Sequence, residues 1–183
     1  YEANAITLFP AGIGEAWAPA PYAQTSLGED FALVDDTLAW VKQNYNTDGR
    51  VFAAGFSNGG GFVRALACNR QLDGAATVSA ANYDAVDENC EGKPTPYFAV
   101  HGTADVVINY GGGTAHGGHY RGVEETMAEV AEDNACDPFP AEHREDAVTR
   151  FTWGSCAVPT VNYKIKGGTH TWNGGVTDRS GLV

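Results

Sequence analysis

The sequence predicts an α/β fold with a doubly wound, mostly parallel sheet. Short apolar runs of strand length alternate with longer stretches in which apolar residues recur at helical spacing. Residues 55–59 read Gly-Phe-Ser-Asn-Gly and stand between such an apolar run and a helical stretch of small residues. A tight turn from a strand into a helix is expected there, and the alternation around it indicates parallel strands joined by helices.

The first two elements are predicted from the N-terminal quarter of the chain. The apolar run at residues 5–9 is interpreted as a strand, and residues 29–45 as an amphipathic helix. Ser26 and Glu29 have the spacing of a capping box, in which each side chain hydrogen-bonds to the backbone of the other. The apolar residues that share one face of this helix are Phe31, Val34, Leu38 and Val41.

The remaining elements continue the alternation without a linker or an internal repeat, so residues 1–183 are treated as a single domain. The predicted strands are residues 51–54, 75–79, 97–100 and 161–165, and the predicted helices are residues 60–67 and about 122–132. The glycine-rich stretch at 110–118 is predicted to be a surface loop near the functional site.

Ser57 is the candidate nucleophile. It occupies the centre of a G-x-S-x-G pattern, and this pattern marks a nucleophile elbow when a strand precedes it and a helix follows. Glycines beside the serine let strand and helix approach closely while the hydroxyl points out of the sheet. The backbone N–H of Asn58, the next residue, is then expected to donate to the oxyanion hole.

Asp105 and His170 complete a candidate triad in the order serine, acid, histidine. Asp105 follows the predicted strand at 97–100, and His170 follows the one at 161–165. The carboxyl ends of parallel strands meet at one edge of the sheet, where catalytic groups gather. The other interpretations are that Ser57 is a polar turn residue and that Asp105 caps a turn. His101 is expected to hydrogen-bond locally.

Charge and composition exclude several classes of partner. The chain has 11 basic and 23 acidic residues, a formal net charge of −12 and 43% hydrophobic residues. Such a surface repels phosphate backbones and anionic lipids, so neither nucleic acid nor a membrane is expected as a partner. No apolar run is long enough to cross a bilayer. Neither a metal nor a cofactor is predicted, and we expect a monomer.

The four cysteines, Cys68, Cys90, Cys136 and Cys156, lack the close spacing of a zinc site and are predicted to form disulfides. Three pairings are open. A bond between Cys68 and Cys90 would close a local loop after the elbow helix. Cys136 and Cys156 flank the segment before the last strand and would pair with each other. The alternative is that the thiols are free and buried in a cytosolic protein.

Three motifs together resemble the secreted family of polyhydroxybutyrate depolymerases and feruloyl esterases, α/β-hydrolases that also include acetylxylan esterases. They are residues 55–60, residues 101–105 with Tyr110 behind them, and residues 167–172, and residues 8–12 with Trp17 give weaker support. The resemblance covers nearly the whole chain. It implies Ser57 as nucleophile, Asp105 as acid and His170 as base, and it favours esters over amides as substrates.

The resemblance makes feruloyl esters on plant cell-wall xylan the first expected substrate of a secreted, extracellular esterase, with polyhydroxyalkanoates or acetylxylan second. Trp172 is either a wall of the substrate pocket or a packing residue. The family's strand with a His-Gly oxyanion loop has no counterpart before Tyr1, so the domain is expected to be N-terminally incomplete. A non-catalytic module that binds polysaccharide is the alternative of a different class.

Overall fold

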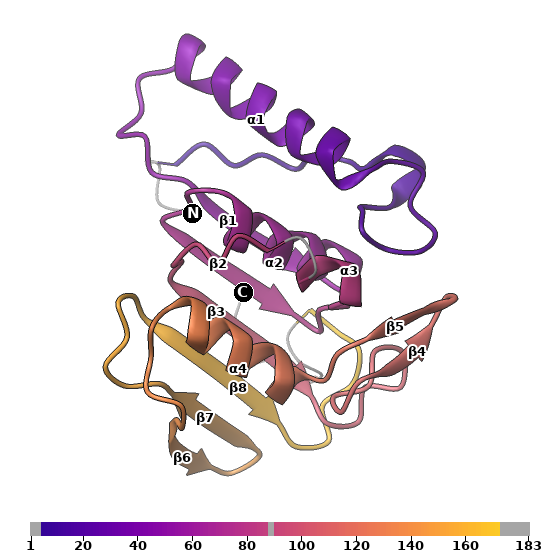
Figure 1. Cartoon of the computed structure of the whole chain (residues 1–183), viewed down its shortest axis with the longest axis vertical. Helices are drawn as coiled ribbons and strands as arrows, with labels where there is room; N and C mark the ends of the chain where they lie inside the picture. Colours follow the sequence, from indigo (N-terminus) through magenta and orange to yellow (C-terminus); the bar gives the residue numbers. More distant parts are fainter. Residues whose placement is uncertain (1–4, 88–89, 173–183) are drawn as a thin grey trace.

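A computed structural model describes residues 5–87 and 90–172 of the chain. Its main element is a six-stranded sheet with the strand order β1-β2-β3-β8-β7-β6 (Figure 1). The strands are β1 (Phe52–Phe56), β2 (Gly74–Val78), β3 (Tyr97–Gly102), β6 (Ala141–Glu145), β7 (Val148–Thr152) and β8 (Thr160–Ile165). The predicted α/β class and the mostly parallel sheet are confirmed.

Strands β1, β2, β3 and β8 run parallel, so their carboxyl ends lie at the same edge of the sheet. In register, Phe56 of β1 pairs with Val78 of β2, and Gly102 of β3 pairs with Ile165 of β8. Each predicted parallel strand after residue 50 is confirmed to within a few residues. The loops that follow β1, β3 and β8 are therefore brought to one edge.

The helices are α1 (Leu27–Asn44), α2 (Asn58–Asn69), α3 (Asp84–Asp87) and α4 (Val123–Asp133), and Ile13–Glu15 forms one 3-10 turn. The predicted capping box of Ser26 and Glu29 is present at the start of α1. Helices α2 and α4 pack on the sheet and share one apolar core with Phe31 of α1. None of the described helices is both long and apolar enough to span a bilayer.

The predicted strand at residues 5–9 is wrong, because this segment joins neither sheet. Its apolar side chains are exposed: Phe9 is 88% exposed and Ile6 is 44% exposed. Alternation of apolar residues predicts a strand only where a neighbouring strand can take up the backbone hydrogen bonds. Within the described residues, none lies beside this segment.

Two antiparallel hairpins were not predicted. Strands β6 and β7 extend the sheet beyond β8, and β6 is exposed along its whole length, so it lacks the apolar alternation that identifies a strand. Strands β4 (Gly113–Ala115) and β5 (Gly118–Tyr120) form a short hairpin that begins inside the predicted loop at 110–118 and ends two residues beyond it. In Figure 1 this hairpin projects from the sheet edge to which the parallel strands point.

The face of the sheet opposite α2 and α4 carries an apolar groove of about 430 Å³. Phe52 is 65% exposed and Phe98 is 41% exposed on this face, whereas Ala75 and Ala99, one position along in the pleat, are buried in the core. Successive residues of a strand point to opposite faces, and paired residues of neighbouring strands share a face, which explains this division.

The structure contains a disulfide between Cys136 and Cys156, the pair that flanks the β6–β7 hairpin. The predicted pairing of Cys68 with Cys90 is wrong for this structure, in which both are free thiols. Their sulfurs take part in hydrogen bonds instead: the two thiols interact with each other, and the Cys90 thiol also lies 3.7 Å from a carboxylate oxygen of Asp133. Cys68 and Cys90 therefore lie close together, as predicted, but their contact is non-covalent.

The two thiols are expected to differ in reactivity. The hydrogen bond from Cys68 lowers the pKa of Cys90 to about 7, whereas this contact and burial raise the pKa of Cys68. Because the thiolate is the reactive form, iodoacetamide at pH 7 should alkylate Cys90 in the native protein and Cys68 only after unfolding. Peptide mass spectrometry measures both, with Cys90→Ser as the control. Failure to alkylate either cysteine in unfolded, unreduced protein would show instead that the two form a disulfide.

Candidate active site

Ser57 lies in the sharp turn between β1 and α2. Its backbone has φ 55° and ψ −120°, a conformation that residues other than glycine rarely adopt. The turn is held on both sides, because the Ser57 N–H donates to the Val78 carbonyl and the Ser57 carbonyl accepts from the Ala81 N–H, each at 3.0 Å. Ser57 therefore has the strained geometry of a nucleophile elbow.

Glycines allow this turn to be tight. A side chain at Gly55 would collide with the carbonyl oxygen of Gly59, and one at Gly61 would collide with the carbonyl oxygen of Ala81. The strand, the turn and the segment after β2 therefore approach more closely than any larger residue would allow. This explains the glycine at the first position of the pattern, whereas a side chain at Gly59, its last position, would meet no atom within 4 Å.

The structure brings Ser57, Asp105 and His170 together, although they are far apart in the chain. His170 Nε2 lies 3.0 Å from Ser57 Oγ, and His170 Nδ1 lies 2.8 Å from Asp105 Oδ2. The carboxylate can only accept, so Nδ1 carries the proton and Nε2 is free to accept the serine proton. These distances are hydrogen-bond distances, so the serine, the base and the acid are linked as in a catalytic triad.

The Asp105 side chain is fully buried and multiply hydrogen-bonded. Its Oδ1 accepts the backbone N–H groups of Val107 at 2.9 Å and Ile108 at 2.8 Å, while Oδ2 faces His170. Burial raises the pKa of Asp105, but the hydrogen bonds from His170, Ile108 and Val107 outweigh burial and hold the pKa below its ordinary value. The acid is therefore ionised and fixed in orientation.

The side chain of Asn58 has a role that the sequence did not indicate. It accepts from the Trp17 N–H at 2.8 Å and donates to the Trp17 carbonyl at 2.9 Å. The Trp17 ring stacks on Phe62 of α2, with ring centroids 4.6 Å apart. The Asn58 side chain therefore ties the N-terminal segment to the elbow. Its backbone N–H, at the first residue of α2, stays the predicted oxyanion donor.

The Phe56 ring lies near the rings of both His170 and Trp172. The Phe56 ring centroid lies 4.7 Å from that of His170 and 6.2 Å from that of Trp172. Trp172 is 55% exposed, so it presents most of one ring surface to solvent two residues after the base. Phe56 is the variable residue of the elbow pattern, and its contact with His170 could not be inferred from that pattern.

Val106 and Val107, next to Asp105, are 86% and 44% exposed, so the loop that carries the acid has an apolar surface. Within residues 5–87 and 90–172, no three histidine, cysteine or acidic side chains cluster in a way that could hold a metal ion.

Comparison with known proteins gives several relatives that are named as esterases. The chain is 29% identical over 176 residues to feruloyl esterase D of Neurospora crassa, a match that covers 91% of this chain and 54% of that protein. It is 30% identical over 175 residues to feruloyl esterase C of Emericella nidulans, covering 91% and 57%. The chain is similar to feruloyl esterases. No family model matches it.

A third relative is a bifunctional acetylxylan esterase/xylanase of Neocallimastix patriciarum, 28% identical over 146 residues that cover 78% of this chain and 21% of that protein. The match to each of the two feruloyl esterases covers little more than half the length of that protein.

Proposed function

We propose that this chain carries the catalytic triad of a secreted serine esterase of the feruloyl esterase family. The observation that supports the proposal most strongly is the hydrogen-bonded series from Ser57 through His170 to Asp105 at the carboxyl edge of the parallel strands. The similarity to feruloyl esterases supports an ester as the substrate. The Cys136–Cys156 disulfide is consistent with an extracellular location.

The reaction proceeds in two steps. His170 Nε2 takes the proton of Ser57 while Oγ attacks the ester carbonyl carbon, and Asp105 stabilises the imidazolium through Nδ1–H. The tetrahedral oxyanion is stabilised by the Asn58 backbone N–H and a second donor. His170 then gives its proton to the leaving alcohol, and an acyl-Ser57 ester remains. Water, deprotonated by His170, attacks the carbonyl carbon of this ester. His170 then returns the proton to Ser57 Oγ as the bond to the acyl group breaks and the acid leaves.

The substrate we propose is a hydroxycinnamoyl ester on plant cell-wall xylan, bound by a monomeric enzyme. Trp172, Val106 and Val107 present apolar surface on the two loops that carry His170 and Asp105, and such a surface suits a planar aromatic acyl group. Acetylxylan is the second candidate, favoured by the relative named as an acetylxylan esterase/xylanase.

Trp172→Ala is expected to raise the KM for methyl ferulate roughly 10-fold, because a lost aromatic contact weakens binding by about 0.5–1.5 kcal/mol beyond the loss of buried area. Methyl acetate has the same leaving alcohol and no aromatic acyl group, so its kcat/KM should change less than about 2-fold. Steady-state kinetics on both esters measures the ratio.

Trp40→Ala is the matched control, because Trp40 on α1 is 54% exposed, nearly the same as Trp172, and its ring packs on Tyr45. Equal loss on both esters in Trp172→Ala would contradict aromatic acyl recognition by Trp172. Faster hydrolysis of the acetyl than of the feruloyl ester by the wild-type chain would favour the acetylxylan candidate.

A further inference from the structure

A second histidine contacts the triad acid. His101, on β3 four residues before Asp105, has its Nε2 atom 3.2 Å from Asp105 Oδ2. The same atom lies 2.9 Å from the carbonyl oxygen of Ile108. His101 is 3% exposed and Asp105 is 2% exposed, so this contact is shielded from water. The triad mechanism makes no use of His101.

The position of the proton on His101 follows from its partners. A backbone carbonyl can only accept, so the His101 Nε2 atom that faces the Ile108 oxygen must carry hydrogen. This N–H is shared with the Asp105 carboxylate, which also interacts with it by a hydrogen bond. Burial, opposed by these contacts, lowers the pKa of His101, so the ring is neutral at pH 7.

Ile108 links the two contacts into one unit. Its N–H donates to Asp105 Oδ1 at 2.8 Å, and its carbonyl accepts from His101. The carboxylate is thus held at Oδ1 by the loop backbone and at Oδ2 by two imidazole rings, one of which is His170. A carboxylate held on all sides cannot rotate away from His170 when the base becomes charged.

We propose that His101 is a positioning residue for the triad, which holds Asp105 in the orientation that His170 requires. This inference rests on the proposed esterase function. His101 contacts neither Ser57 nor the surface on which an acyl group would bind, so it acts through Asp105. It should therefore influence kcat and leave KM nearly unchanged.

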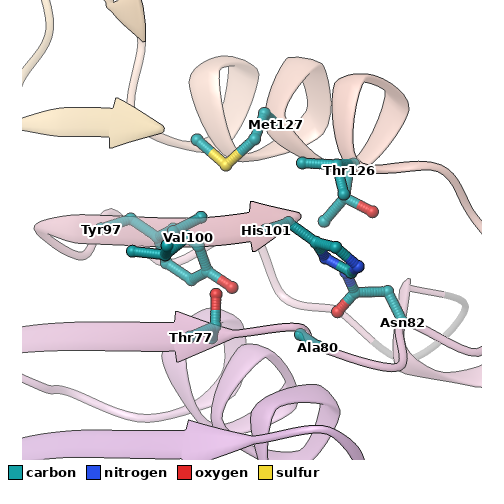
Figure 2. Close-up of a pocket in the computed structure, with 10 residues that line it drawn as sticks. Thr77, Ala80, Asn82, Tyr97, Val100, His101, Thr126 and Met127 are labelled. Atoms are coloured by element: carbon teal, nitrogen blue, oxygen red, sulfur yellow. The ribbon is translucent and has the colours of Figure 1, made fainter. Parts of the chain in front are cut away.

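The surroundings of the ring allow a sharp test. Figure 2 shows His101 between Thr126 of α4 and Asn82, where these residues line a cavity of about 10 Å³, room for about one water molecule. Thr126 Oγ1 and Asn82 Oδ1 are buried and have no hydrogen-bond partner among the described residues. A polar side chain of similar length at position 101 would therefore have two polar partners in this partly apolar cavity.

The experiment compares His101→Gln with His101→Asn. The glutamine amide nitrogen reaches the place of Nε2 and keeps a donor to Asp105, whereas the asparagine amide reaches only the place of Nδ1. With methyl ferulate, His101→Asn is expected to lower kcat roughly 10-fold to 100-fold with KM within about 2-fold, the range for a lost hydrogen bond to a charged group. His101→Gln should keep kcat within about 5-fold of the wild type.

Equal kcat in all three proteins, or equal loss in both variants while they unfold at the wild-type temperature, would overturn the proposal. If His101→Asn does not fold, wild-type kcat in a folded His101→Gln supports it and a loss greater than 10-fold overturns it. A second readout needs no turnover: nitrogen-15 NMR of histidine-labelled protein should show His101 neutral with hydrogen on Nε2. Hydrogen on Nδ1 would overturn the proposal. If the wild type hydrolyses no ester, the proposed function fails, and the NMR tautomer still decides the contact with Asp105.

Discussion

Ser57→Ala is expected to lower the kcat of ester hydrolysis by about 10⁵-fold, because no other group can form the acyl-enzyme ester. His170 Nε2, 3.0 Å from Ser57 Oγ, then has no proton to accept, and Asp105 has no imidazolium to stabilise. The free energy of unfolding should change little, since alanine keeps the Cβ and the backbone conformation of Ser57 and the substitution creates no cavity. Methyl ferulate hydrolysis and thermal unfolding measure the two quantities.

A fluorophosphonate probe gives a second measure of Ser57, because it labels only a serine whose proton is taken by a base. Labelling is expected in the wild type and absent in Ser57→Ala. Ser155→Ala is the control, since Ser155 is exposed and donates to Asp137 rather than to a base. Wild-type rates in Ser57→Ala would rule out the triad. A chain that neither hydrolyses esters nor reacts with the probe would favour the polysaccharide-binding module.

Asp105→Asn is expected to lower kcat by about 10⁴-fold, the loss known for the same exchange in a serine protease triad. The backbone N–H groups of Val107 and Ile108 hold the amide oxygen, so the amide NH₂ faces His170. That arrangement forces hydrogen onto His170 Nε2, which then cannot accept the Ser57 proton. KM should change little, because Asp105 does not touch the substrate. Asp137→Asn is the control on an exposed aspartate.

The same variant should alter the dependence of stability on pH. The pKa of folded Asp105 lies below its unfolded value of about 3.9, so its ionised form stabilises the fold above that pH. The contribution is lost as pH falls through the folded pKa. Below about pH 4, thermal unfolding temperature should therefore fall more steeply in the wild type than in Asp105→Asn. Parallel curves for the two proteins would contradict a lowered pKa.

Elements whose signals lie within a short stretch of residues could be predicted from the sequence. The parallel strands could be predicted because a buried strand has a short run of apolar residues, and this signal lies within the strand itself. The elbow at Ser57 could be predicted because its glycines and its strand–helix context lie within a dozen residues. Chain order and strand ends then sufficed to select Asp105 and His170, since parallel strands carry their following loops to one edge.

Strand pairing, side-chain contacts and cysteine state depend on residues distant in the chain, so they became known only from the tertiary structure. Residues 5–9 have the composition of a strand and lack a neighbour, whereas β6 is polar throughout and is a strand because β7 pairs with it. His101 was expected only to hydrogen-bond locally, and its contact with Asp105 depends on how the loop folds back through Ile108. Cys68 and Cys90 were expected to form a disulfide, and in the structure they are free thiols that contact each other. Hydrogen-bond partners are selected by their positions in space. Residue types and spacing along the chain do not give these positions for residues that are far apart in the sequence.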